Sequence, residues 1–181
     1  MPEPRPPKLV LAEQWARSAG KPTDWLEGRF SPSSPVEVVL VVYQGPISVY
    51  VRVQEEALRV FVQANLPEEA REALRNLSDE LKTKLTFLVR QALLSEARVA
   101  YQVAPVDLKS IEHLEKFTVE EILMVSEEDT STMNRFLDAI VEVTVVAMRV
   151  GQLLSTAGPQ SGGPPERGFD VPKQPPGEMY R

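Results

Sequence analysis

Few residues in this chain could do chemistry, and His113 is its only histidine. A histidine can act as a general base or bind a metal, but both roles need partners at defined spacing. The neighbouring Glu112 and Glu115 make no recognisable ligand pattern, and no nucleophile can be paired with His113 from the sequence. The absence of cysteine excludes disulfides, thiolate catalysis and cysteine-bound zinc. We therefore expect no catalytic residue, no metal and no cofactor.

Adjacent carboxylates are the other candidates for acid–base chemistry. They occur at Glu55-Glu56, Glu68-Glu69, Glu120-Glu121 and Glu127-Glu128-Asp129. Neighbouring acids at turns and helix starts are better explained by solvation or by the positive end of a helix dipole. The glycines form neither a dinucleotide-binding nor a P-loop pattern. The sequence therefore predicts a protein that is not an enzyme.

An acidic patch favours a binding role. Between positions 112 and 129 the chain holds seven acidic residues and a single basic one, Lys116. The acidic residues are Glu112, Glu115, Glu120, Glu121, Glu127, Glu128 and Asp129. Such a patch could attract a basic partner, although simple solubility explains it equally well.

A second feature that favours binding is the C-terminal tail, residues 158–181, which is rich in Pro, Gly and Ser. Its candidate partner-binding residues are Phe169, Val171, Met179, Tyr180, Arg167 and Arg181. Pro172 and Pro175 have the spacing of a polyproline-type segment. The tail is either a docking peptide or a sequence without such a role.

Composition predicts one domain flanked by tails. The chain has 181 residues, of which 43% are hydrophobic, enough for a core. We expect a Pro-rich extended N-terminus over 1–8, one α+β domain over 9–157, and a tail over 158–181 that is disordered or ordered by a partner. A net charge of −6 disfavours a generic nucleic-acid binder. No signal peptide or membrane span is recognisable, so we expect a cytoplasmic protein, and scarce thermolabile residues suit a thermophile.

Three consecutive strands over 36–64 form the predicted centre of the fold, because apolar and polar residues alternate there. A short helix over 9–19 and a loop over 21–35 precede them, and the loop's Trp25, Leu26 and Phe30 are expected to pack on the core. The first strand, 36–43, is apolar on nearly both faces. Its residues Val39, Val41 and Tyr43 are candidates for a second face that a homodimer could cover.

Helical and strand patterns alternate in the rest of the chain. Pro67 opens a helix, and Ser78 resembles a second N-cap before an apolar stripe of residues 81–93. A strand is expected over 98–104. Residues 108–123 fit a strand or a helix, with Thr118 as a capping-box residue in the helical case, and we favour the strand. A final helix starts near Ser126 and continues to about Ser155.

This order resembles the class I type III secretion chaperone-like fold and, more narrowly, an uncharacterised archaeal domain-of-unknown-function family with that fold. The resemblance is carried by the meander over 36–64, Leu66-Pro67, residues 76–80, residues 101–105 and the last helix. It implies an antiparallel sheet of about five strands with helices packed on it, in the order α-βββ-α-ββ-α. It also implies a protein-binding module, often dimeric, without catalytic residues.

Two functional hypotheses follow. The first is a non-enzymatic macromolecule-binding module, a chaperone-like or adaptor protein that acts as a dimer and binds a protein partner. The alternative is a ribosome- or ribonucleoprotein-associated factor. In that case the Pro-rich tails, with Arg5, Arg167 and Arg181, would insert into RNA or protein channels while the acidic domain faces protein.

Overall fold

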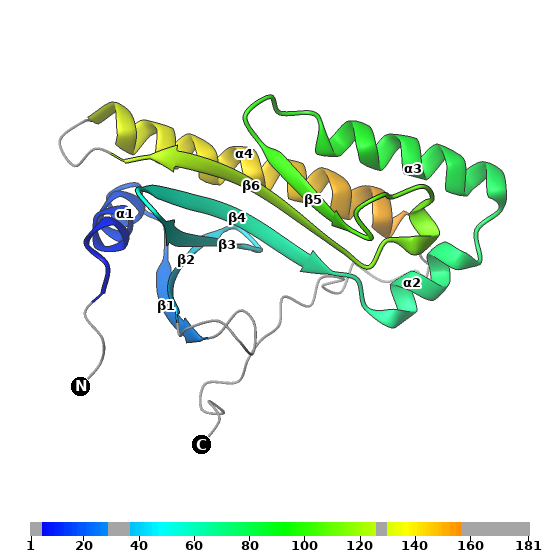
Figure 1. Ribbon diagram of the computed structural model, residues 1–181, viewed down its shortest axis with the longest axis horizontal. Coiled ribbons are helices and arrows are strands. Elements are labelled where there is room, and N and C mark those ends of the chain that lie inside the picture. The colour runs from blue at the N-terminus through cyan, green and yellow to red at the C-terminus, as the bar shows by residue number, and fades with distance from the viewer. Residues whose placement is uncertain (1–4, 29–36, 126–129, 157–181) are drawn as a thin grey trace, which may run out of the picture. The chain divides into compact units, whose positions relative to one another are not determined.

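The computed structural model describes residues 5–28, 37–125 and 130–156. Their strands form a six-stranded antiparallel sheet in the order β1-β2-β3-β4-β6-β5 (Figure 1). The strands are β1 Thr23–Gly28, β2 Glu37–Gln44, β3 Ile47–Gln54, β4 Ala57–Asn65, β5 Ala100–Ala104 and β6 Lys116–Met124. The helices are α1 Pro7–Ser18, α2 Glu68–Arg75, α3 Asp79–Leu93 and α4 Thr130–Ser155, with a 3-10 turn, η1, at Ile111–His113. An α+β fold is therefore confirmed.

The chain divides into two compact units. Among the described residues, the first unit holds the chain up to Val62 together with Glu120–Thr144, and the second holds Gln63–Val119 and the residues from Val145 onward. Strands β4 and β6 and helix α4 each pass from one unit into the other.

The predicted three-strand meander is present in the first unit as β2, β3 and β4. Two-residue turns join the strands, and each turn has one residue in the left-handed region, Gly45 at φ 58° and Glu55 at φ 54°. The register sets Leu40 opposite Val51 and Val51 opposite Val60, so one face is continuously apolar. Helix α1 packs on this part of the sheet through Leu9, Ala12 and Ala16, which are buried because their spacing puts them on one face. The helix begins at Pro7, two residues before the predicted start, because proline suits the first helical turn.

Strand β2 is buried on both faces, as its apolar sequence predicts. On the face away from Leu40, Val39 is 1% exposed and Val41 is 3% exposed, whereas Tyr43 is exposed. The neighbouring Tyr50 stacks on Phe61 with ring centroids 5.6 Å apart. Val39 and Val41 therefore lie inside a single chain, and the apolar face that suggested a dimer is not open at these two residues.

The predicted loop over 21–35 is wrong in its first part, because residues 23–28 form strand β1. The strand adds to the edge of β2, with Trp25 opposite Leu40, and brings the sheet to six strands rather than about five. The Trp25 indole Nε1 donates a hydrogen bond of 3.0 Å to Glu13 Oε1, which ties the strand to α1. Leu26 is 44% exposed rather than packed in the core, and Phe30 lies outside the described residues.

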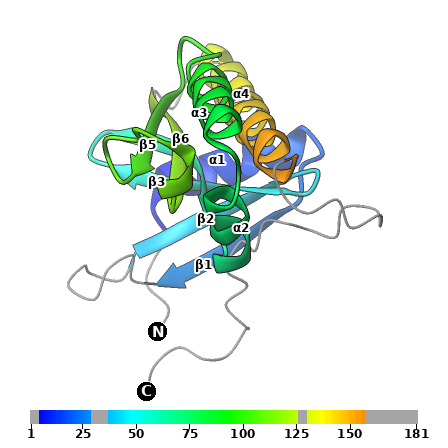
Figure 2. The same ribbon diagram turned by 90° about the vertical axis from the view of Figure 1, so that its right-hand side faces the viewer.

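The second unit contains two helices in succession where the predicted order counted one. Pro67 stands at the N-cap of α2, and the Ser78 hydroxyl accepts a hydrogen bond of 3.4 Å from the Leu81 N–H at the start of α3. The Ser78 cap is therefore confirmed. In both views α3 lies beside the C-terminal end of α4 (Figures 1 and 2), where Arg149 bonds to Ser95 and Glu96.

The ambiguous stretch 108–123 becomes a 3-10 turn followed by a strand. The strand prediction is confirmed for β6, in which Phe117 and Val119 are buried. Thr118 is also buried within that strand and caps no helix, so the capping-box alternative is wrong.

No helix among the described residues has the length and apolar character that crossing a bilayer requires.

Candidate interaction surface

The described acidic residues of the predicted patch are each close to a basic side chain. In the second unit, Glu112 Oε2 lies 2.6 Å from Lys82 Nζ, and exposed Glu115 Oε1 lies 3.9 Å from an Arg71 guanidinium nitrogen. In the first unit, Glu120 pairs with Arg59, and Glu121 Oε1 accepts a hydrogen bond of 2.7 Å from Arg135. These carboxylates serve as internal ion-pair partners, and the attraction of a basic partner to them stays a prediction. Glu127, Glu128 and Asp129 lie outside the described residues.

The candidate tail residues also lie outside the described part of the chain. They are Phe169, Val171, Met179, Tyr180, Arg167 and Arg181. The ribosome hypothesis depends on this tail, and no feature of the described residues supports it. It stays a prediction.

His113 lies beside a charged hollow in the second unit. The hollow has a volume of about 240 Å³ and is lined by Arg71, Arg75, Pro105, Glu112, His113 and Glu115. Its charged groups are paired, because Glu68 pairs with both arginines and Glu112 pairs with Lys82. His113 Nε2 lies 3.6 Å from Glu112 Oε1. Across the described residues, no group of histidine and carboxylate side chains is arranged to hold a metal ion.

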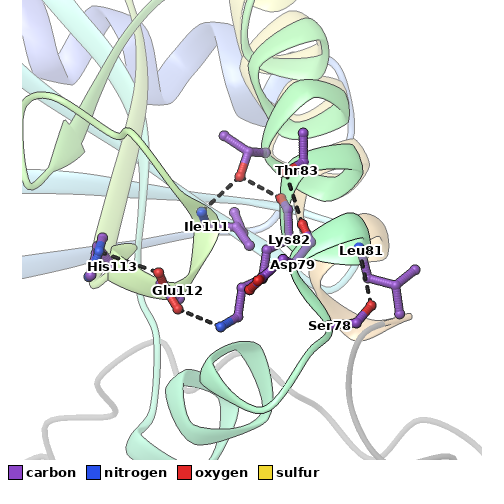
Figure 3. A network of polar contacts seen from close by, with 9 residues as sticks. Ser78, Asp79, Leu81, Lys82, Thr83, Ile111, Glu112 and His113 are labelled. Atoms are coloured by element: carbon purple, nitrogen blue, oxygen red, sulfur yellow. Dashed lines mark hydrogen bonds and ion pairs between the residues drawn. The ribbon is translucent and has the colours of Figure 1, made fainter.

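A polar network connects the 3-10 turn η1, which contains His113, to α3 (Figure 3). The Thr86 hydroxyl accepts a hydrogen bond of 2.8 Å from the Ile111 N–H and donates one of 2.6 Å to the Lys82 carbonyl. Lys82 in turn pairs with Glu112, and this hydrogen bond lowers the pKa of the Glu112 carboxyl below its ordinary value. These contacts fix η1 against the inner side of α3, so the opposite side of the helix has no such role.

Helix α3 presents large apolar side chains to solvent on two of its sides. Leu81 is 50% exposed and Phe87 is 60% exposed, and Leu94, at the helix C-cap, is 67% exposed. Phe87 and Leu94 are seven residues apart, which places them on the same side of the helix. Leu81 is about 120° away from Phe87 around the helix, at the edge of the buried stripe. The buried face of α3 is formed by other residues, among them Leu85, Val89 and Leu93, which pack in the core. The exposed Leu81, Phe87 and Leu94 are therefore not required for packing α3 on the core.

A shallow groove runs along one flank of this surface. It has a volume of about 260 Å³ and is lined by Leu77, Leu81, Lys84, Leu85, Leu88 and Thr156. Four leucines supply most of the lining, and Lys84 supplies its one charged group. We call the groove and the exposed Leu81, Phe87 and Leu94 together the α3 surface.

Sequence reasoning missed this surface because it assigned Leu81 and Leu88 to the buried stripe of the helix. The signal that could have found it is Phe87 together with Leu94, because both lie away from that stripe on a helical projection. A helix with apolar residues on two sides is either buried all round or faces a partner on one of them.

The comparisons with known proteins define the fold and leave the function open. No family model and no curated protein matches the chain. Among solved structures, an uncharacterised protein from Methanothermobacter thermautotrophicus matches with a TM-score of 0.58 and 15% identity, over 82% of this chain and 96% of that one. YbjN from E. coli matches with a TM-score of 0.41 and 12% identity, over 81% and 94% of the two chains. The chain thus has the fold of an uncharacterised archaeal protein, as the predicted resemblance implied in its coarser form.

Proposed function

We propose that this protein is a non-enzymatic binding module, a chaperone-like or adaptor protein that holds an apolar segment of a partner protein on its α3 surface. The observation that carries the proposal is the exposure of Leu81, Phe87 and Leu94 on one helix that already has a complete buried face. Large apolar side chains that gather on a surface mark interaction sites in proteins, and Phe87 and Leu94 lie on one side of α3.

The composition of the α3 surface fits a protein partner better than a nucleic acid. Aromatic and leucine side chains dominate it, and Lys84 is the one charge in its groove. Nucleic-acid sites depend instead on clustered basic residues, which a chain of net charge −6 does not favour. A partner segment with apolar residues at helical or alternating spacing would bury these side chains.

The finer resemblance to class I type III secretion chaperones belongs to this proposal. It is supported by the α+β order of the elements. Chaperones of this kind hold other chains without altering them covalently, which is the role proposed for the α3 surface. A homodimer is part of the same proposal, and its test is the mass in solution at several protein concentrations.

The experiment is affinity capture with the full chain and two matched variants. Phe87→Glu with Leu94→Glu places charge on the α3 surface, and Gln91→Glu adds one charge at an exposed polar position of the same helix. We expect the double variant to capture at least tenfold less partner protein than the parent, and the Gln91 variant to capture as much as the parent. The two variants should keep the circular dichroism spectrum of the parent. Equal capture by all three proteins would show that partners bind elsewhere.

A further inference from the structure

We infer that the chain's own tail is a ligand of the α3 surface, with Phe169 and Val171 seated in its leucine-lined groove when no partner is bound. This inference rests on the proposed function, because it names the segment with which a partner competes. It also gives the C-terminal tail a regulatory role: the tail shields the apolar groove in the free protein.

The groove lies where the tail begins. Helix α4 ends at Ser155, and the next residue, Thr156, is itself part of the groove lining. Residues 157–168 follow, and they contain no large apolar side chain. The first such residues after the groove are Phe169 and Val171. A spacer rich in Gly and Pro therefore separates the groove rim from the first residues able to fill it.

The spacer has a suitable length. A random-coil linker with as many residues as 157–168, which is 12, has an end-to-end distance of about 20 Å. Tethering at this length gives the tail an effective concentration in the millimolar range. Even a weak intrinsic affinity for the groove would then produce substantial occupancy.

The chemistry of the two surfaces is complementary. In an extended peptide, Phe169 and Val171 lie on one side, so both can face the leucines while Asp170 points away from them. Charged residues of both signs surround Phe169 in the sequence, namely Glu166, Arg167, Asp170 and Lys173, and Lys84 is the one charged group of the groove. Phe169 and Val171 therefore match the groove through apolar contact rather than through charge.

Tail docking has a measurable consequence for partner binding. If the tail fills the groove about nine-tenths of the time, a partner that needs the empty groove binds about tenfold more weakly. Substitution of Phe169 and Val171 by alanine should therefore raise the affinity of the α3 surface for its partner by that factor.

The test uses paramagnetic broadening in the full chain. Because the protein has no cysteine, Lys173→Cys gives one attachment site for a nitroxide. We expect strong broadening of the Leu81 and Leu88 methyl signals, and its loss when Phe169→Ala and Val171→Ala are added. The matched control, Met179→Ala with Tyr180→Ala, should keep the broadening because it leaves the docking residues intact.

Three results would overturn the inference. The first is equal broadening of Leu81 and Leu88 with and without Phe169 and Val171. The second is loss of broadening in the Met179 and Tyr180 control. The third is broadening that appears only when a spin-labelled chain is mixed with a methyl-labelled one, because the tail would then bind a second copy. A proposed function that fails has a different signature: the α3 variants would still capture partners, whatever the tail does.

Discussion

Arg59 of β4 and Glu120 of β6 form an ion pair that is largely shielded from water. Their side chains are 15% and 9% exposed, and the Arg59 guanidinium also lies 5.0 Å from the centroid of the Phe61 ring. Arg59, Phe61 and Glu120 all belong to the first unit, so the pair and the ring contact stabilise the sheet there.

We therefore expect Glu120→Gln to destabilise the protein by about 3 kcal/mol, because removing one partner leaves a shielded charge uncompensated. Urea unfolding followed by circular dichroism measures the loss. Replacing both residues together, with Arg59→Met and Glu120→Leu, should recover most of it, because no isolated charge then remains. A double variant that is no more stable than the single one would show that the pair itself, rather than the orphaned charge, matters.

The Lys82–Glu112 pair predicts a pH dependence. The Lys82 hydrogen bond lowers the pKa of Glu112 in the folded state from an ordinary value of 4.5. A carboxyl with a lowered folded pKa stabilises the fold above its unfolded pKa, and this contribution is lost as the pH falls through the folded value. Carbon-detected NMR titration of the Glu112 carboxyl should show the lowered midpoint directly. In Lys82→Met the midpoint should rise, and an unchanged midpoint would contradict this account.

Two phenylalanines in helices should respond very differently to truncation. Phe136 is fully buried in α4, with its ring centroid 5.8 Å from that of Trp15, whereas Phe87 is exposed on α3. We expect Phe136→Ala to lower the free energy of unfolding by about 4 kcal/mol through cavity formation. Phe87→Ala should change it by less than about 0.5 kcal/mol. Urea unfolding of the two variants checks this, and a large loss in Phe87→Ala would mean that the ring packs within the chain.

The sequence was sufficient to predict elements in which side-chain period and burial agree. Alternation between 36 and 64 predicted β2, β3 and β4, and the Ser78 hydroxyl predicted the start of α3. Strand β1 was not predicted, because Trp25 and Leu26 are the only large apolar residues among its six. The strand depends on pairing with β2 rather than on an alternating pattern of its own.

The candidate site was less predictable than the fold. Leu81 has the spacing of a buried residue, but it lies at the edge of the helical stripe, and only the packed neighbours decide whether such a position is covered. Glu120 and Glu121 were predicted to form part of a patch because sequence counts charge without showing its partners. Arg59, 61 residues before Glu120, pairs with it only because β4 and β6 are neighbours in the sheet.

Val39 and Leu26 face each other across β2 and β1, yet they differ in burial. Val39 is 1% exposed and Leu26 is 44% exposed, although they are paired in the register. We expect Val39→Ala to lower the free energy of unfolding by about 2 kcal/mol. Leu26→Ala should lower it by much less, because folding buries less of the apolar surface of Leu26 than of Val39. Unfolding measured at two protein concentrations also tests the origin of the burial. If Val39 is covered by its own chain, the stability lost in Val39→Ala should not depend on protein concentration. A loss of stability that grows on dilution would place β2 at a dimer interface.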